Sequence, residues 1–324
     1  MRPIAECDTV QIELTSACVL TCSNCTRFVG HQRKPFFLSG VEFRSAIDSL
    51  VGFVEGTNGI VGIMGGEPLL SPHFEEFCEY ALERIPRERL GLWSTFPQKF
   101  VRYREVICRT FGNILLNDHS RGDILHAPLL QASEEFFRNP DGTVNSADLH
   151  LACEHCWVQE SWSASINPKG AWFCEVAAAL SDLFDGPQGW DVEPDWWKRS
   201  TKDFTAQREW ACPKCSGALP LARRASIEDK TDASPGNLER LRAVGARRLD
   251  DVIVHASPVF DKTLVGNTYP KQTYQEESFR KGIAARYGIG LSMTPRGYWS
   301  PYLLPDGWQP EKRPPSIFSI LPTT

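Results

Sequence analysis

The sequence predicts an α/β protein: a partial (β/α) barrel of about five or six parallel strands, then a small cysteine-bearing domain, then a C-terminal extension. Short apolar runs alternate with helical patterns up to about residue 150. A strand–helix unit takes about 30 residues, so this stretch is too short for an eight-stranded barrel, which needs about 250. A second group of cysteines begins after residue 150. We therefore expect a core over 1–150, a small domain over 151–216 and an extension over 217–324.

The expected strands of the core are short and rich in apolar residues. Residues 10–15 alternate apolar and polar side chains with a period of two, and residues 60–64 are almost wholly apolar. Two further strands are expected over 90–94 and 113–117. Strands that alternate with helices pair in parallel through right-handed crossovers, so the loops at their carboxyl ends are where chemistry is expected.

Helices are expected between these strands. Ser39 and Glu42 form a capping-box pattern, and apolar residues follow at helical spacing up to Val54. The second and third helices are expected over 73–84 and 101–111.

Composition limits the kind of protein this is. The chain has 324 residues, 42% of them apolar, which is enough for a sizeable core. A net charge of −5 gives no general field that would attract nucleic acid, so nucleic acid is not an expected partner. No run approaches about 18 apolar residues and the N-terminus has no apolar signal segment, so we expect a cytoplasmic protein without membrane contact.

The eleven cysteines are grouped in a way that indicates metal binding. CxxxCxxC and CxxC groupings without a signal segment favour reduced thiols over a secreted disulfide framework. Cys7, Cys78 and Cys108 stand outside the groupings and are expected to be small buried hydrophobes.

Cys18, Cys22 and Cys25 follow the first expected strand in a CxxxCxxC pattern. Three thiolates in one loop leave one position of a four-coordinate site open for something other than protein. Thiolate is the usual ligand of iron–sulfur clusters, and short spacings let one loop wrap a cluster. Zinc and unrelated free thiols are the alternatives for this pattern alone.

A second motif, Gly65-Gly66-Glu67-Pro68, follows the second expected strand. Together with the cysteine loop it resembles the radical S-adenosylmethionine (radical SAM) superfamily. The resemblance implies that the three cysteines hold a 4Fe-4S cluster whose open iron binds SAM. It also implies that the backbone of the second motif meets the SAM amino group, which glycines permit because they have no side chain. An electron from a donor such as flavodoxin or ferredoxin would then split SAM into a 5′-deoxyadenosyl radical.

The same resemblance suggests further SAM contacts. Ser94 and Asn117, at the ends of the third and fourth expected strands, are candidates for the SAM ribose or carboxylate, or else they cap the helices that follow. Many members of the superfamily carry an aromatic residue just before the third cysteine, where it lies against the adenine. This chain has Asn24 there, so Phe28 is the candidate for packing on the adenine.

The second cysteine group supplies enough thiolates to close a metal site completely. A turn sequence at 167–170 between alternating runs predicts a β-hairpin, with a helix expected over 175–184. The order of these cysteines resembles the twitch domain, a shortened SPASM domain, which implies one auxiliary 4Fe-4S cluster. Structural zinc is the alternative. The four cysteines are Cys156, Cys174, Cys212 and Cys215.

Chemistry on a substrate radical needs further groups. Cys153 is a fifth cysteine, which either replaces Cys156 as a ligand, donates a hydrogen atom as a free thiol, or is an inert buried thiol. An oxidation would also need a general base. The titratable groups nearest the two cysteine sites in sequence are Asp118, His119, His155 and Glu175.

The extension carries no recognisable motif. Residues 223–237 are polar and charged and are expected to be a linker, followed by a helix over 238–244. The aromatic residues that follow this helix either cover a substrate pocket as a lid or pack within an added subdomain. They are Tyr269, Tyr274, Tyr287, Tyr298, Trp299 and Tyr302.

By resemblance, the expected function is that of a radical SAM enzyme, an oxidoreductase or epimerase. It would dehydrogenate or epimerise a sugar-like or other polar small molecule, with the auxiliary cluster as an electron relay. A second hypothesis is the modification of a ribosomally made peptide, although no peptide-recognition domain precedes the core. A third is a zinc-stabilised interaction protein without enzymatic activity.

Overall fold

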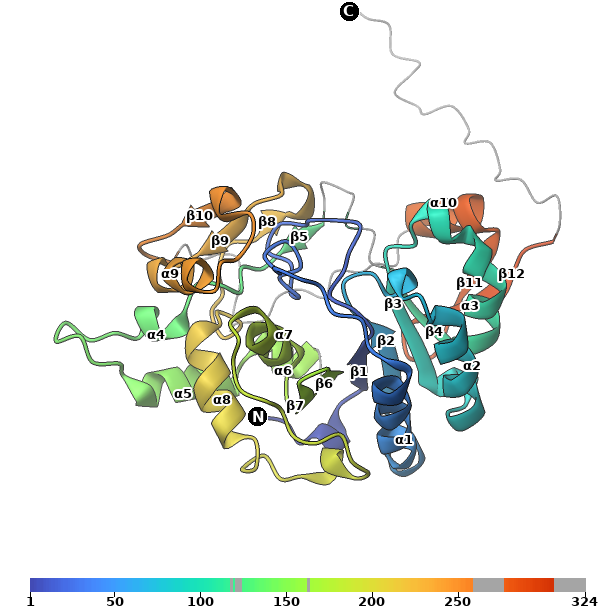
Figure 1. The fold of residues 1–324 in the computed structure, drawn as a ribbon, viewed down its shortest axis with the longest axis horizontal. Coiled ribbons are helices and arrows are strands. Elements are labelled where there is room, and N and C mark those ends of the chain that lie inside the picture. The colour runs from blue at the N-terminus through green and yellow to red at the C-terminus, as the bar shows by residue number, and fades with distance from the viewer. Residues whose placement is uncertain (117–118, 120–123, 162–163, 259–276, 306–324) are drawn as a thin grey trace, which may run out of the picture.

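The computed structural model describes residues 1–116, 119, 124–161, 164–258 and 277–305. The described residues form a central eight-stranded sheet in the order β11-β12-β4-β3-β2-β1-β6-β7 (Figure 1). Neighbouring strands from β6 through β1, β2 and β3 to β4 are parallel, while β7, β12 and β11 join antiparallel. This largely parallel sheet is compatible with the expected partial barrel. The strands are β1 (Thr9–Glu13), β2 (Ile60–Met64), β3 (Leu90–Ser94), β4 (Asn113–Leu116), β6 (Ser165–Asn167), β7 (Gly170–Trp172), β11 (Ile289–Met293) and β12 (Trp299–Leu303).

Three helices connect the parallel strands and lie side by side along the sheet (Figure 1). They are α1 (Gly40–Gly56), α2 (Phe74–Arg84) and α3 (Arg104–Thr110). The capping box is confirmed, because the backbone N–H of Glu42 donates to Ser39 Oγ (3.3 Å) and the Glu42 carboxylate accepts from the Ser39 N–H (2.7 Å). The third helix is shorter than expected, because a 3₁₀ helix over Gln98–Tyr103 takes its first turn.

The two faces of the sheet differ in chemistry. Val10, Ile12 and Leu14 belong to the main apolar core. The residues between them, Gln11 and Glu13, therefore lie on the opposite, inner face, because side chains alternate along a strand.

Trp93 also belongs to the inner face, in a small separate cluster with Ile60 and Met64. A Cβ at Gly62 would lie 2.9 Å from the Trp93 ring, and one at Gly91 would lie 2.0 Å from it. These glycines therefore leave room for the indole to lie against the face of the sheet.

The predicted hairpin is confirmed as β6 and β7, with a turn at 168–169. It also extends the central sheet, because β6 pairs in parallel with β1. Cys174 follows β7 and is the N-cap of α7 (Glu175–Leu183), close to the expected helix. The remaining helices of this part are α4 (Ser133–Phe136), α5 (Ser146–Glu154), α6 (Trp157–Ser161) and α8 (Thr205–Ala211).

The expected linker over 223–237 is wrong. This stretch contains β8 (Arg224–Ala225), which pairs with β5 (Leu125–His126), and β9 (Thr231–Ala233), which pairs with β10 (Val252–Val254). It continues into α9 (Pro235–Ala243), which begins three residues earlier than the predicted helix. Its polar side chains are not solvated as they would be in a linker. Several of them are buried and hydrogen-bonded within the protein, including Asp232 and Asn237.

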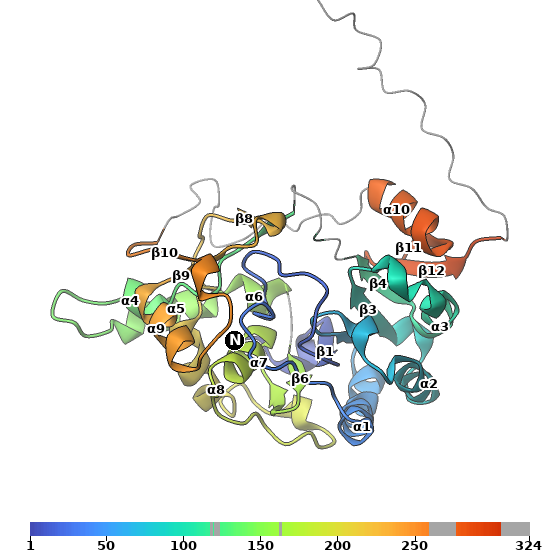
Figure 2. The same ribbon diagram turned by 45° about the horizontal axis from the view of Figure 1, so that its top comes forward.

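The last described part is α10 (Glu277–Tyr287) with β11 and β12, beside β4 and α3 (Figures 1 and 2). Tyr287 and Trp299 are buried in the main core, and Tyr298 packs on Trp93, so these aromatics serve packing; Tyr302 is half exposed. Tyr269 and Tyr274 lie outside the described residues. Across the described ranges, no helix has the length and apolar character needed to cross a bilayer.

Candidate functional site

The cysteine loop and the GGEP motif lie side by side at the carboxyl ends of β1 and β2. The N–H groups of Gly66 and Glu67 donate to the carbonyls of Thr15 (2.7 Å) and Ala17 (2.8 Å). A Cβ at Gly65, where φ is +151°, would lie 2.3 Å from the Thr15 oxygen, and one at Gly66 would lie 2.2 Å from the Ala17 oxygen. Glycine is therefore required at both positions for this close approach.

Glu67 fastens the end of this motif to the next strand. Its fully buried carboxylate accepts hydrogen bonds from Leu69 N (3.1 Å), Ser94 Oγ (2.7 Å), Thr95 N (2.9 Å) and Thr95 Oγ1 (2.8 Å). Burial raises the pKa of Glu67, and these four donors act in the opposite direction. Ser94 is thus engaged with Glu67, and its contact with SAM stays a prediction.

Burial keeps two thiols of the first cysteine loop protonated in the chain alone. It raises the pKa of Cys18 to about 12 and also raises that of Cys22, with the charges of neighbouring thiols adding to the effect. Binding a positively charged metal centre would therefore release protons from this loop. The N–H of Leu20 donates to Cys18 Sγ (3.5 Å), a contact of the kind that tunes iron–sulfur potentials.

Phe28 lies beside this loop. It is buried, has a left-handed backbone (φ 52°), and lines one small cavity together with Cys22, Cys25, His31 and Arg248. Its contact with adenine stays a prediction.

A buried ion-pair network joins the first cysteine loop to the second cysteine group. Arg27, two residues after Cys25, is 3% exposed and contacts Glu175 Oε2 through Nη2 (2.8 Å) and Glu13 Oε1 through Nε (3.4 Å). Glu175 directly follows Cys174, so this ion pair links a residue two positions after Cys25 to the residue after Cys174. Arg27 Nη2 also donates to the side-chain oxygen of Gln11 on the inner face (2.9 Å).

Sequence reasoning selected Glu175 from this network but missed Arg27 and Glu13. Burial raises the pKa of Glu13 to about 7 against the attraction of Arg27. The one available signal was a charged residue at an alternating position of the first strand, with no indication that this face points inward.

The five cysteines of the second group line one cavity with Phe173, Arg208 and Gly217. The N–H of Gly217 donates to Cys215 Sγ (3.2 Å), and a Cβ at Gly217 would lie 3.2 Å from Cys156 Sγ. A hydrogen bond between the Cys153 and Cys212 thiols lowers the pKa of Cys153 and raises that of Cys212. Because Cys153 and Cys156 reach the same cavity, both remain candidates for the fourth ligand.

The donors that line this cavity are thiols, which suit an iron–sulfur cluster and a zinc ion alike. Around one zinc ion, with Zn–S of about 2.3 Å, tetrahedral thiolates lie about 3.8 Å apart. Within the described ranges, no group of three His, Cys, Asp or Glu side chains is arranged so that it could hold a metal ion. An iron–sulfur cluster is larger than a single ion and is held chiefly by thiolates, so the cysteines that line this cavity could hold one.

The remaining predicted site residues do not all lie near the two cysteine groups or within the described residues. Asn117 and Asp118 lie outside the described residues. His119 lies near the cysteine loop: its ring packs on His126 (centroids 4.4 Å apart), and His126 Nδ1 donates to the Ser23 carbonyl (2.7 Å). Burial, and to a lesser extent His126, lowers the pKa of His119 to about 3, so it would be neutral and weakly basic. His155 is exposed at the end of α5.

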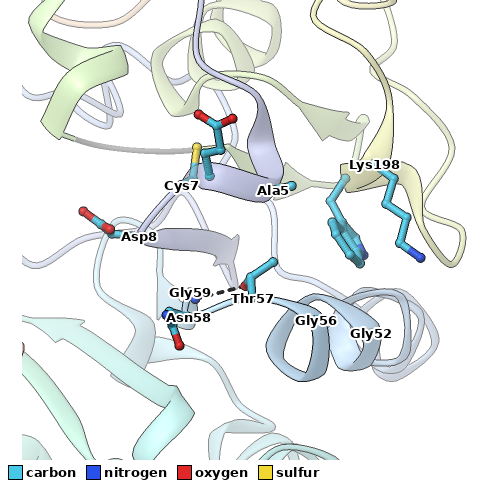
Figure 3. A pocket seen from close by; sticks show the side chains of 11 residues that line it. Ala5, Cys7, Asp8, Gly52, Gly56, Thr57, Asn58, Gly59 and Lys198 are labelled. Atoms are coloured by element: carbon cyan, nitrogen blue, oxygen red, sulfur yellow. Dashed lines mark hydrogen bonds between the residues drawn. The ribbon is translucent and has the colours of Figure 1, made fainter.

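A separate cavity of about 540 Å³ lies at the opposite end of the parallel strands (Figure 3). Asp8, Asn58 and Gly59 line it, and they immediately precede β1 and β2. It therefore sits at the amino ends of these strands, whereas the cysteine loop and GGEP follow their carboxyl ends.

Solved structures similar to this chain include one of the protein BtrN. No family model matches the chain, and no curated protein matches it. The crystal structure of BtrN in complex with AdoMet and 2-DOIA is similar over 64% of this chain and 87% of that chain, at 16% identity and a TM-score of 0.35. A likeness at this level does not extend to function.

Proposed function

We propose that this chain is a radical SAM enzyme that oxidises, by dehydrogenation, or epimerises a polar or sugar-like small molecule. The observation that carries the proposal is the contact between the cysteine loop and GGEP, made through Thr15, Ala17, Gly66 and Glu67 at the carboxyl ends of adjacent parallel strands. This edge is where α/β sheets place their binding sites.

Cys18, Cys22 and Cys25 would hold a 4Fe-4S cluster with one open iron, and the GGEP backbone would receive the amino end of SAM. When bound, these two groups supply an electron and a radical that abstracts hydrogen from an unactivated carbon. The chain's own part is positional: the glycines bring the motif against the loop, and Glu67 holds it to β3.

The second cysteine group would hold an auxiliary 4Fe-4S cluster that relays an electron, with flavodoxin or ferredoxin as the external donor to the enzyme. The ion pair between Arg27 and Glu175 supports this arrangement, because it fixes the two cysteine sites relative to one another. Oxidation of an alcohol needs a proton acceptor, for which Asp118, His119, His155 and Glu175 are the predicted candidates.

The test is to replace Cys18, Cys22 and Cys25 together by Ala and to measure 5′-deoxyadenosine formed from SAM under dithionite without oxygen. We expect complete loss of this product with the auxiliary iron retained. The matched control replaces Cys7, Cys78 and Cys108, which lie outside both groups, and should keep the activity. Continued formation of 5′-deoxyadenosine by the first variant would refute the assignment.

A further inference from the structure

Residues 223–255 pack directly on the first cysteine loop, although more than 190 residues separate them in sequence (Figures 1 and 2). The N–H groups of Ser23 and Asn24, the two residues between Cys22 and Cys25, donate to the carbonyls of Ser226 (2.8 Å) and Lys230 (3.2 Å). Both residues between these cysteines are therefore held by backbone hydrogen bonds to this segment.

Side chains reinforce the contact on either side. Thr21 Oγ1 donates to Asp229 Oδ1 (3.1 Å), and the N–H of Lys230 donates to Ser23 Oγ (3.0 Å). Arg248 Nη1 donates to the Thr21 carbonyl (3.2 Å). The loop is thus bound along its length and not at a single point.

Asn24 and Asp232 form the central pair of this contact. Asn24 Nδ2 donates to Asp232 Oδ2 (2.8 Å), and the Asp232 N–H donates back to Asn24 Oδ1 (2.9 Å). The two residues are 2% and 3% exposed, so water cannot replace these bonds. Asn24 also has a left-handed backbone (φ 47°), which Asn adopts more readily than most residues.

Asp232 is itself held in place. Arg224 donates to both of its carboxylate oxygens, through Nε (2.9 Å) and Nη2 (2.7 Å), and His255 Nε2 contacts Oδ1 (2.7 Å). The acceptor that faces Asn24 therefore has a fixed orientation before any cofactor arrives.

We propose that residues 223–255 form a clamp that holds the turn between Cys22 and Cys25 in its ligating shape, with Asn24 and Asp232 as its positioning residues. The clamp accounts for Asn at the position where the superfamily often has an aromatic residue. A loop shaped in advance loses little conformational freedom when it binds a cluster, so it should capture iron readily and release it slowly. The effect on the capture and release of iron rests on the proposed function, whereas the effect on the shape of the loop does not.

The test uses the full-length chain with three variants. Asn24→Asp sets a carboxylate against Asp232 and removes the amide donor. Asp232→Asn is a milder change that keeps an acceptor for Arg224. The double variant Asn24→Asp/Asp232→Asn exchanges the two groups and restores the reciprocal pair, but, like Asp232→Asn, it keeps only one carboxamide oxygen to accept from Arg224. The control is Asn145→Asp, because Asn145 and Asp148 make the same reciprocal bonds on an exposed helix end (2.7 and 3.2 Å).

Two measurements decide the proposal. Hydrogen exchange over residues 19–26 reports the shape of the loop directly, and we expect the Ser23 and Asn24 amides of Asn24→Asp to exchange at least about tenfold faster than in wild type. Iron loss to a chelator, followed through the SAM-dependent electron paramagnetic resonance signal, should accelerate by about the same factor. The double variant should recover most of both effects relative to Asn24→Asp, its melting temperature should be no lower than that of Asp232→Asn, and Asn145→Asp should match wild type.

Unchanged exchange in both single variants, or a double variant no better than Asn24→Asp, would overturn the clamp. If the single variants instead show faster exchange that the double variant reverses, the clamp stands. A wild-type chain that cleaves no SAM would remove the proposed function alone, because hydrogen exchange still decides the clamp.

Discussion

A Glu13→Gln variant should be more stable than the wild-type chain above pH 7 and nearly equal to it at pH 4.5 to 5. Glu13 is 3% exposed, and its hydrogen bond from Ser165 Oγ (2.7 Å) and its ion pair with Arg27 (3.4 Å) do not compensate for the loss of water. Burial therefore raises the pKa of Glu13 from 4.5 to about 7. Gln has the same shape, can accept the Ser165 bond, and carries no charge.

The sign and size follow from proton binding. Between pH 4.5 and 7 the folded chain holds a proton on Glu13 that the unfolded chain has lost, so the stability of the wild type falls as pH rises through this window. A shift of 2.5 pKa units at about 1.4 kcal/mol per unit corresponds to about 3 kcal/mol. Above pH 7 the free energy of unfolding of the wild type should therefore be lower than that of the variant by this amount. For 324 residues the entropy of unfolding is about 0.7 kcal/mol/K, so the melting temperatures should differ by about 4 to 5 °C.

The assay is thermal unfolding followed by circular dichroism at pH 5, 6, 7 and 8, under reducing conditions without oxygen. Glu55→Gln on the exposed side of α1 is the matched control for the loss of one surface carboxylate. If the advantage of Glu13→Gln does not grow between pH 5 and pH 8, the Arg27 ion pair outweighs desolvation and the reasoning is wrong.

Two predictions concern the second cysteine group. Reconstituted wild-type protein should contain about eight irons per chain, falling to about four when Cys212 and Cys215 are changed to Ala, because each cubane holds four irons. Zinc at that site in anaerobically purified native protein would instead support the structural alternative. Cys153→Ala assayed with the true substrate in deuterated water should keep full turnover and place no solvent deuterium on carbon, as oxidation requires. Lost turnover with intact clusters, together with deuterium at one inverted carbon of the wild-type product, would indicate epimerisation.

The core could be predicted because its signals are local. Alternation in β1 and the apolar run of β2 placed both strands to within about two residues, and the capping box marked the start of α1. Once parallel pairing is assumed, the loops after β1 and β2 must meet, so the contact between the cysteine loop and GGEP follows from topology.

Local signals gave the wrong answer where polar residues are buried. The segment over 223–237 has the composition of a linker, and nothing near it in sequence shows that Asp232 faces Asn24, which lies 208 residues away. Arg27 and Glu175 are 148 residues apart and were missed as a pair for the same reason. Buried polar groups must find hydrogen-bond partners, but composition cannot say which ones.

The first cysteine loop is shaped by three distant parts of the chain. GGEP holds its start through Thr15 and Ala17, the clamp holds its middle through Ser23 and Asn24, and Arg27 ties its end to Glu175. A chain ending at residue 216 would keep every motif that resembles the superfamily. It would lose all the contacts that the clamp makes with the middle of the loop. Motifs alone therefore do not define the shape of this loop, because its middle is hydrogen-bonded to a segment that carries none of them.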